Sequence, residues 1–122
     1  MKVLLIEDNE QNRYLATFLL ERHNCTVVHA PDGPAGIARA AQEAFGLILL
    51  DIQLPGMDGY AVAQALRKIP GLAETPVIAV TSYAMAGDRE KALAAGCSYY
   101  IEKPINPDTF VTEVMTHLGP PK

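Results

Sequence analysis

The chain has 122 residues, 49% of them hydrophobic and 20% charged, with a formal net charge of −4 at pH 7. This suits one globular core near the commonest domain size of roughly 100 to 150 residues, so we expect a single domain over residues 1–122. Net negative charge argues against nucleic-acid binding, because a phosphate backbone is held mainly by clustered Lys and Arg. Without a run of about 18 apolar residues or a secretory signal, we expect a soluble, cytoplasmic protein with no membrane contact.

The first third of the chain predicts two strands and two helices in alternation. Residues 3–6 are continuously apolar, which is typical of a strand buried on both faces. A helix follows, with Asn9 as its cap and Asn24 near its end. Three apolar residues stand at helical spacing within it: Leu15, Phe18 and Leu19. Thr26–Ala30 reads as the second strand, and a Pro-Asp-Gly-Pro turn opens an alanine-rich helix that we expect to reach Ala44.

The rest of the chain repeats this alternation three times. Residues 47–50 and 77–80 are wholly apolar strands, and between them Asp58 can cap a helix over residues 59–69. A fourth helix over residues 88–95 is closed by Gly96 as a left-handed stop. Residues 99–102 form the fifth strand, and residues 107–118 the last helix. Five strand-helix units in strict alternation predict an α/β fold with a parallel sheet covered on both sides.

Polar groups follow four of the five strands. Glu7 and Asp8 follow the first, Asp51 the third, Thr81 the fourth and Lys103 the fifth. Because parallel strands point the same way, these groups are expected at one edge of the sheet, where ligands bind in such folds. The second strand ends in His29 and Ala30 and contributes nothing reactive, which fits a place at the margin of the sheet.

Three acids at one edge require neutralisation. At about 5 Å and an effective dielectric constant near 20, each like-charge pair costs roughly 3 kcal/mol. Either one acid holds a proton or a divalent cation lies among them, and we favour the cation. Oxygen ligands without His or Cys favour Mg²⁺ or Mn²⁺ over zinc. Cys25 and Cys97 have no metal-type spacing and are expected to be buried thiols, and the scattered histidines predict no metal site.

Such a site can take up a phosphoryl group. A cation and the Lys103 ammonium group attract phosphoryl oxygens, and a carboxylate can attack phosphorus to form an acyl phosphate. Phosphoryl transfer depends mainly on positioning and charge neutralisation, so the cation, Lys103 and the Thr81 hydroxyl would suffice around the acceptor. Asp51 is the expected nucleophile because it ends a central strand. Taken singly, Asp8 or Asp58 could equally cap a helix, and Lys103 could be a solvated charge.

The motifs together resemble the receiver domain of two-component response regulators over the whole chain. They are Glu7-Asp8-Asn9, Asp51 with the following Ile-Gln-Leu-Pro-Gly-Met-Asp-Gly, Thr81-Ser82, and Lys103-Pro104. The resemblance implies a doubly wound, flavodoxin-like fold with strand order 2-1-3-4-5. The segment 84–88 is more similar to receivers of hybrid kinases and of stand-alone phosphorelay or cell-cycle regulators than to those of transcription factors.

The resemblance also implies roles for single residues. Asp51 would accept the phosphoryl group from a histidine kinase, a histidine phosphotransfer protein or acetyl phosphate. Asp8, Asp51 and the backbone carbonyl of Gln53 would bind Mg²⁺, and Glu7 would assist through a water molecule. The protein would be a self-phosphorylating acceptor with autophosphatase activity rather than a turnover enzyme. Gln53 and Tyr83 occupy positions that tune dephosphorylation in the family, so the lifetime of the phosphorylated state stays open.

The switch and the output surface follow from the same resemblance. Lys103 would pair with the phosphoryl group, Thr81 would turn to bond it, and the Tyr100 ring would turn inward. The expected output is a changed surface of the fourth helix, fifth strand and fifth helix, which binds a downstream protein. Taken alone, Tyr100 could be half-buried packing. A cis peptide bond is expected between Lys103 and Pro104.

The same residues fit other classes of protein less well. An aspartate-nucleophile phosphatase would show Asp-x-Asp after the first strand, whereas the chain has Asp8-Asn9-Glu10. A nucleotide-binding module would need a glycine-rich first turn. A phosphorylation-independent interaction module of the same fold, or a receiver cut from a hybrid kinase, stays open.

Overall fold

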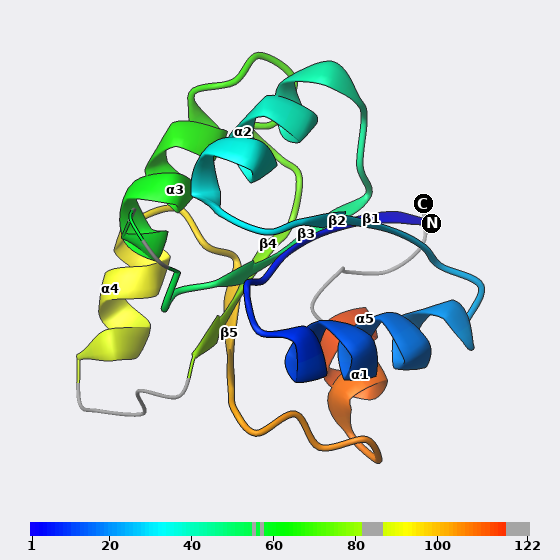
Figure 1. Ribbon diagram of the computed structural model, residues 1–122. Helices are drawn as coiled ribbons and strands as arrows, with labels where there is room; N and C mark the ends of the chain where they lie inside the picture. The colour runs from blue at the N-terminus through cyan, green and yellow to red at the C-terminus, as the bar shows by residue number, and fades with distance from the viewer. Residues whose placement is uncertain (55, 57, 82–86, 117–122) are drawn as a thin grey trace.

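A five-stranded parallel sheet in the order β2-β1-β3-β4-β5 forms the centre of the protein, with helices on both faces (Figure 1). The computed structural model describes residues 1–54, 56, 58–81 and 87–116, so Pro55, Met57, the 82–86 segment with Tyr83, and His117 lie outside the described residues. The predicted fold class and strand order are confirmed. Within the described ranges, no helix is both long and apolar enough to cross a membrane.

The elements alternate strictly along the chain. The strands are β1 (Lys2–Ile6), β2 (Thr26–Ala30), β3 (Leu47–Asp51), β4 (Val77–Thr81) and β5 (Tyr99–Glu102). The helices are α1 (Glu10–Glu21), α2 (Gly33–Gln42), α3 (Gly59–Arg67), α4 (Asp88–Ala94) and α5 (Phe110–Thr116).

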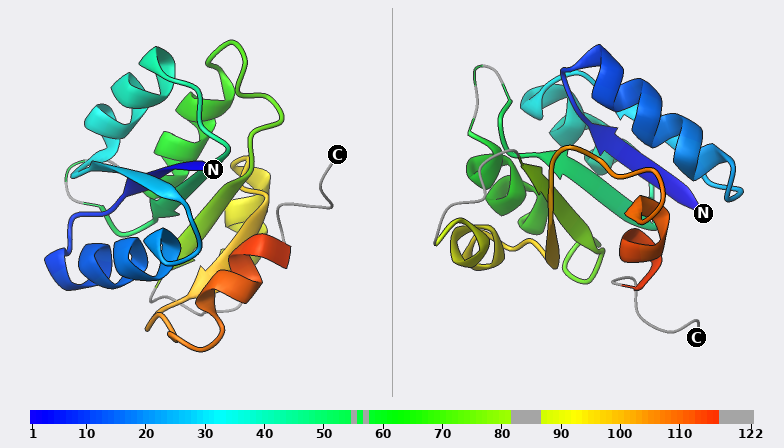
Figure 2. Two further views of the ribbon diagram at one scale, coloured as in Figure 1. Left: turned by 90° about the vertical axis from the view of Figure 1, so that its right-hand side faces the viewer. Right: turned by 90° about the horizontal axis from the view of Figure 1, so that it is seen from below.

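Two hydrophobic layers sandwich the sheet. Helices α1 and α5 cover one face, and α2, α3 and α4 cover the other (Figures 1 and 2). Along β3, Leu47 and Leu49 pack with the first layer, while Ile48 and Leu50 pack with the second. Every residue of β3 and β4 is buried, which confirms that the continuous apolar runs are strands covered on both faces.

The predicted helix signals fix the loops that lead from the sheet edge. Asn9 caps α1 by accepting a hydrogen bond from the Asn12 amide at 2.9 Å, and Asp58 caps α3 by accepting one from the Tyr60 amide at 3.0 Å. The cap at Asn9 leaves the neighbouring Asp8 carboxylate available for another role. Gly96 ends the α4 turn with a φ of 111°, as expected of a left-handed stop.

The predicted start of the last helix is wrong. Residues 107–109 form a turn, and α5 begins at Phe110. Asn106 holds this turn, because its side-chain oxygen accepts from the Asp108 amide and its carbonyl accepts from the amides of Thr109 and Phe110. An Asn side chain that bonds its own following backbone competes with helix formation. The other boundaries agree to within two residues, except that the predicted end of the last helix at residue 118 lies outside the described residues. Cys25 and Cys97 are buried as expected.

Candidate functional site

The carboxyl ends of three adjacent strands lie level with one another. Asp51 ends β3 and pairs in register with Val80, and Thr81 ends β4 opposite Glu102. Glu7 follows β1 directly, and its amide continues the ladder to the Ala30 carbonyl at 3.1 Å. Glu7, Asp51 and Thr81 are the buried polar side chains of the described residues, at 3%, 3% and 1% exposure. Buried polar side chains at the ends of strands indicate a functional site, because removing polar groups from water costs free energy.

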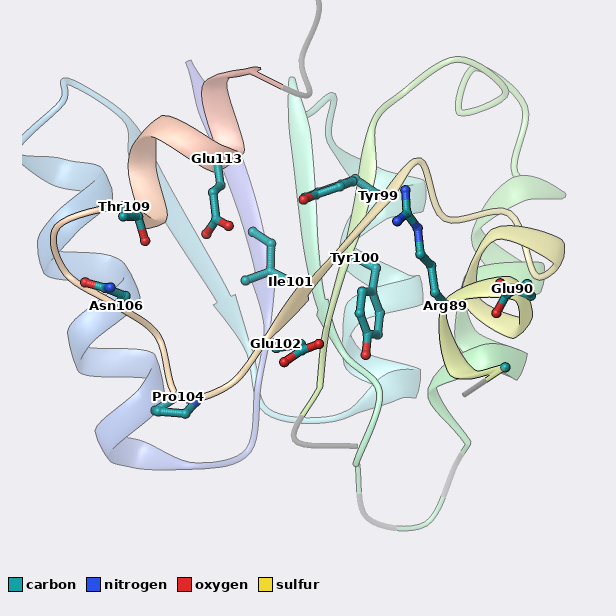
Figure 3. Close-up of a pocket in the computed structure, with 11 residues that line it drawn as sticks. Arg89, Glu90, Tyr99, Tyr100, Ile101, Glu102, Pro104, Asn106, Thr109 and Glu113 are labelled. Carbon is teal, nitrogen blue, oxygen red and sulfur yellow. The ribbon is translucent and has the colours of Figure 1, made fainter. Parts of the chain in front are cut away.

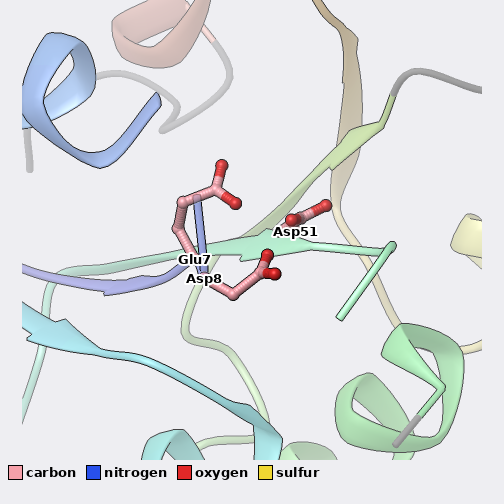
Figure 4. A group of neighbouring side chains, drawn as sticks. All are labelled: Glu7, Asp8 and Asp51. Atoms are coloured by element: carbon pink, nitrogen blue, oxygen red, sulfur yellow. The ribbon is translucent and has the colours of Figure 1, made fainter. Parts of the chain in front are cut away.

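Three carboxyl groups gather at this edge. One oxygen each of Glu7, Asp8 and Asp51 lies within 4.8 Å of the others, and the side chains converge from the end of β1 and the end of β3 (Figure 4). Glu7 and Asp51 are buried, whereas Asp8 is exposed at the mouth. Such a set of hard oxygen donors, open to solvent on one side, fits a small divalent cation such as Mg²⁺.

Lys103 places a positive charge against two of these acids. Its Nζ atom lies 3.2 Å from Asp51 Oδ1 and 3.3 Å from Glu7 Oε1, and its side chain is 10% exposed. Its backbone amide donates to the Thr81 carbonyl at 2.7 Å, which anchors the residue to the end of β4. The Lys103–Pro104 bond is cis, as expected. Lys103 is therefore a largely buried partner of the acidic cluster and not a solvated charge.

The surroundings of Glu7 raise its pKa and so favour its protonated form at neutral pH. Burial is the main cause that raises its pKa from 4.5 to about 8, and the hydrogen bond and like charge of Asp51 raise it further. Lys103 lowers the pKa of Glu7, but it pairs with Asp51 as well, so it does not offset burial. The negative charge of the three acids can therefore be neutralised at this site either by a proton on Glu7 or by a divalent cation. The raised pKa favours a proton on Glu7, and a cation bound there would compete with that proton.

The backbone after Asp51 is held closely. The Gln53 amide donates to Asp51 Oδ1 at 2.9 Å, and the Ile52 amide donates to the Val80 carbonyl at 3.1 Å. Gly59, the first residue of α3, approaches Ile52 so closely that a Cβ there would lie 2.7 Å from the Ile52 carbonyl oxygen. The lack of a side chain at Gly59 therefore lets α3 begin directly against the segment that carries Asp51.

Tyr100 lies apart from the acids. It is half-buried on β5, paired in register with Ala79, and it borders a groove of about 630 Å³ between α4 and α5 (Figure 3). The groove is lined by Gly87, Arg89, Glu90, Tyr99, Tyr100, Ile101, Glu102, Pro104, Asn106, Thr109 and Glu113. Strand β5 therefore carries Tyr100 of this groove, and Lys103 of the acidic cluster follows directly after its end.

Two residues beside the site were not predicted from the sequence, His29 on the second strand and Arg13 on α1; both make structural contacts there and neither is a reactive group of the acidic cluster. His29 Nε2 lies 2.8 Å from the Glu7 carbonyl oxygen, and Arg13 Nη1 lies 3.2 Å from His29 Nδ1. No motif marks either residue. Only the pairing of β1 with β2, which sets Leu5 opposite His29, brings the ring near Glu7.

Comparison with known proteins gives one consistent result. Residues 3–115 match the response regulator receiver domain family. The chain is 38% identical over 117 residues to the polar-differentiation response regulator DivK of Brucella anthropi, covering 96% of this chain and 95% of DivK. It is 45% identical over 105 residues to the signal transduction histidine-protein kinase BarA of Escherichia coli K12. That match covers 86% of this chain, which spans 11% of the length of BarA.

Solved structures with the same fold include a chemotaxis response regulator and the receiver domain of a sensor histidine kinase. Chemotaxis response regulator CheY4 of Vibrio cholerae superposes with a TM-score of 0.90 at 26% identity, over 95% of this chain and 97% of CheY4. The receiver domain of sensor histidine kinase PA1611 from Pseudomonas aeruginosa PAO1 gives a TM-score of 0.88 at 30% identity, over 98% of both chains. That structure has a magnesium ion coordinated in its active-site cleft.

Proposed function

Because the chain belongs to the response regulator receiver domain family, we propose that it is a phosphoacceptor signalling switch in which Asp51 takes up the phosphoryl group. The observation that carries this proposal is the surrounding of Asp51: a buried carboxylate at the end of β3, with an ammonium group at 3.2 Å and two further carboxyl groups beside it. This arrangement supplies a nucleophile, a counter-charge and a cation site within one edge of the sheet.

The donor would be a phosphohistidine on a histidine kinase or a histidine phosphotransfer protein, or a small molecule such as acetyl phosphate. An Asp51 carboxylate oxygen forms the new bond to phosphorus while the donor's bond to phosphorus breaks. With phosphohistidine this is the phosphorus–nitrogen bond and the imidazole leaves; with acetyl phosphate it is a phosphorus–oxygen bond and acetate leaves. The product is an acyl phosphate on Asp51. Similarity to a histidine-protein kinase and to a response regulator supports a donor of this class.

The residues present fit a Mg²⁺ ion. Asp8, Asp51 and the Gln53 carbonyl would hold it, with Glu7 assisting through a water molecule, and Mn²⁺ would fit the same oxygen donors. When bound, the ion supplies positive charge toward the phosphoryl oxygens. The Gln53 amide, which donates to Asp51 Oδ1, limits how that carboxylate can rotate. Glu7 would give up its proton on cation binding, since a cation and a proton compete for the same carboxylate.

The phosphoryl group would act as a switch through Lys103 and Thr81. Lys103 is already 3.2 Å from the Asp51 carboxylate and would pair with a phosphoryl oxygen. The Thr81 hydroxyl would turn toward the same group, and the Tyr100 ring would turn inward as Thr81 moves. The groove between α4 and α5, with β5 as its floor, would then change its affinity for a downstream protein (Figure 3).

Two contexts for this switch are supported by the relatives. DivK, matched over nearly its whole length, supports a separate regulator, whereas BarA, matched over a short part, supports a receiver within a hybrid kinase. The chemistry at Asp51 is the same in both. Fast transfer of the phosphoryl group from Asp51 to the histidine of a phosphotransfer protein would favour a relay intermediate.

The proposal is tested with acetyl phosphate and Mg²⁺. Wild-type protein, Asp51→Asn and Asp58→Asn are incubated under identical conditions, and intact masses are recorded. We expect one phosphoryl group per wild-type chain and per Asp58→Asn chain, and none on Asp51→Asn, because Asp58 only caps α3. Sustained hydrolysis of p-nitrophenyl phosphate by the wild type would instead support a phosphatase. Equal labelling of all three proteins would contradict the proposal.

A further inference from the structure

We propose that His29 is a positioning residue for the cation site, because its ring fixes the peptide group that joins Glu7 to Asp8. This inference rests on the proposed binding of Mg²⁺ beside Asp51. It concerns a residue on the edge strand β2 that takes no part in phosphoryl transfer itself.

The Glu7–Asp8 segment is held from β2 at two points. Strand pairing ends at Ile6 and Ala30, and the Glu7 amide then donates to the Ala30 carbonyl at 3.1 Å. The Glu7 carbonyl lies 2.8 Å from His29 Nε2, so a side chain continues the hydrogen bonding where the ladder stops. That carbonyl belongs to the same planar peptide unit as the Asp8 amide. Holding it therefore fixes the plane from which Asp8 projects.

The ring of His29 is oriented from both sides. A carbonyl oxygen can only accept, so Nε2 carries the hydrogen and Nδ1 has a free lone pair. Arg13, on the first turns of α1, donates to that lone pair with Nη1 at 3.2 Å. One neutral tautomer thus satisfies both contacts, and the ring connects α1, β2 and the end of β1.

Asp8 depends on this backbone support. It is exposed, and within the described part of the chain no hydrogen bond or ion pair holds its carboxylate. Glu7, by contrast, is buried and contacts Lys103 and Asp51. Because no side chain orients the Asp8 carboxylate, its position depends on the position of its backbone. Loss of an outer contact that orients a metal ligand typically lowers metal affinity by about 10- to 100-fold.

The test measures the affinity for Mg²⁺ alone by titration calorimetry at one fixed pH, with thermal unfolding recorded on the same samples. His29→Leu removes both contacts, and His29→Asn stays polar but is too short to reach the Glu7 carbonyl. His29→Gln places an amide nitrogen where Nε2 lies and should restore the bond. His23→Leu, at an exposed histidine, is the matched control.

We expect the Kd for Mg²⁺ to rise about tenfold in His29→Leu and His29→Asn, while His29→Gln and His23→Leu stay close to wild type. A purely structural role would lower the Tm and leave the Kd unchanged, and that result would overturn the proposal. Equal weakening in His29→Gln and His29→Leu would also overturn it. If His29→Leu does not fold, His29→Asn carries the comparison. A wild-type protein that does not bind Mg²⁺ would refute the cation site itself, and this inference with it.

Discussion

Lys103 Nζ lies 3.2 Å from Asp51 Oδ1, and it reaches that carboxylate across β4, because β4 separates β3 from β5 in the sheet. The lysine is therefore the physical connection between the strand that carries the acceptor and the strand that carries Tyr100. A charge change on Asp51 acts directly on the residue just beyond β5.

Removing the charge of Lys103 should affect both stability and phosphorylation. Lys103→Met leaves Glu7 and Asp51 without the ammonium group that pairs with them. Breaking a buried ion pair typically costs about 3 to 5 kcal/mol. We expect a smaller loss of about 1 to 3 kcal/mol in Mg²⁺-free urea unfolding, because Glu7 can keep its proton. Phosphorylation by acetyl phosphate should slow strongly. Lys68→Met, at an exposed lysine, should change neither quantity, and equal behaviour of the two variants would contradict this role.

The raised pKa of Glu7 makes the cation-free protein sensitive to pH. The group titrates near 4.5 when exposed and at about 8 in the fold, so the folded state holds a proton that the unfolded state releases between these values. The resulting stability is fully present below about pH 4.5 and is lost as the pH rises through about 8. Urea unfolding across this window should show that loss in wild type and in Glu10→Gln, but not in Glu7→Gln. Parallel profiles for all three would refute the assignment.

Gly59 should tolerate no side chain. A Cβ there would lie 2.7 Å and 2.8 Å from the carbonyl oxygen and carbon of Ile52, which are backbone atoms next to Asp51. We expect Gly59→Ala to lose about 2 kcal/mol of unfolding free energy and to slow phosphorylation, since Ile52 must shift. Gly46→Ala is the matched control, because its Cβ meets the flexible, exposed side chain of Met1. A phosphorylation rate lowered equally in both variants would show that the effect is not local to Asp51.

The proposed output surface can be located by NMR. Beryllofluoride with Mg²⁺ mimics the phosphoryl group, and we expect backbone shift changes in β4, α4, β5 and the turn before α5. Residues of α2, on the opposite margin of the sheet from β5, should change little. Tyr100→Ala should reduce the changes in α4 while leaving those around Asp51 intact. Changes confined to α1 and α2 would contradict the proposed route.

The sequence is sufficient for the framework of the site but not for its surroundings. Continuous apolar runs determined the strands, and the topology of parallel strands then brought Glu7, Asp51 and Lys103 to one edge. Tyr100 lies on the predicted fifth strand, and Thr81, predicted to follow the fourth strand, is the last residue of β4. The contact of His29 with the Glu7 carbonyl could not be predicted, because it depends on the register of β2 against β1. The late start of α5 likewise depends on where the Asn106 side chain points.

The most direct measurement locates the phosphoryl group within the chain. Protein labelled with acetyl phosphate and Mg²⁺ is digested under mild acid conditions, and the modified carboxylate is identified by peptide mass spectrometry. We predict a single modified residue, Asp51, in the peptide that contains the end of β3. A phosphoryl group on Asp8 or Glu7, or labelling that persists in Asp51→Asn, would contradict the account.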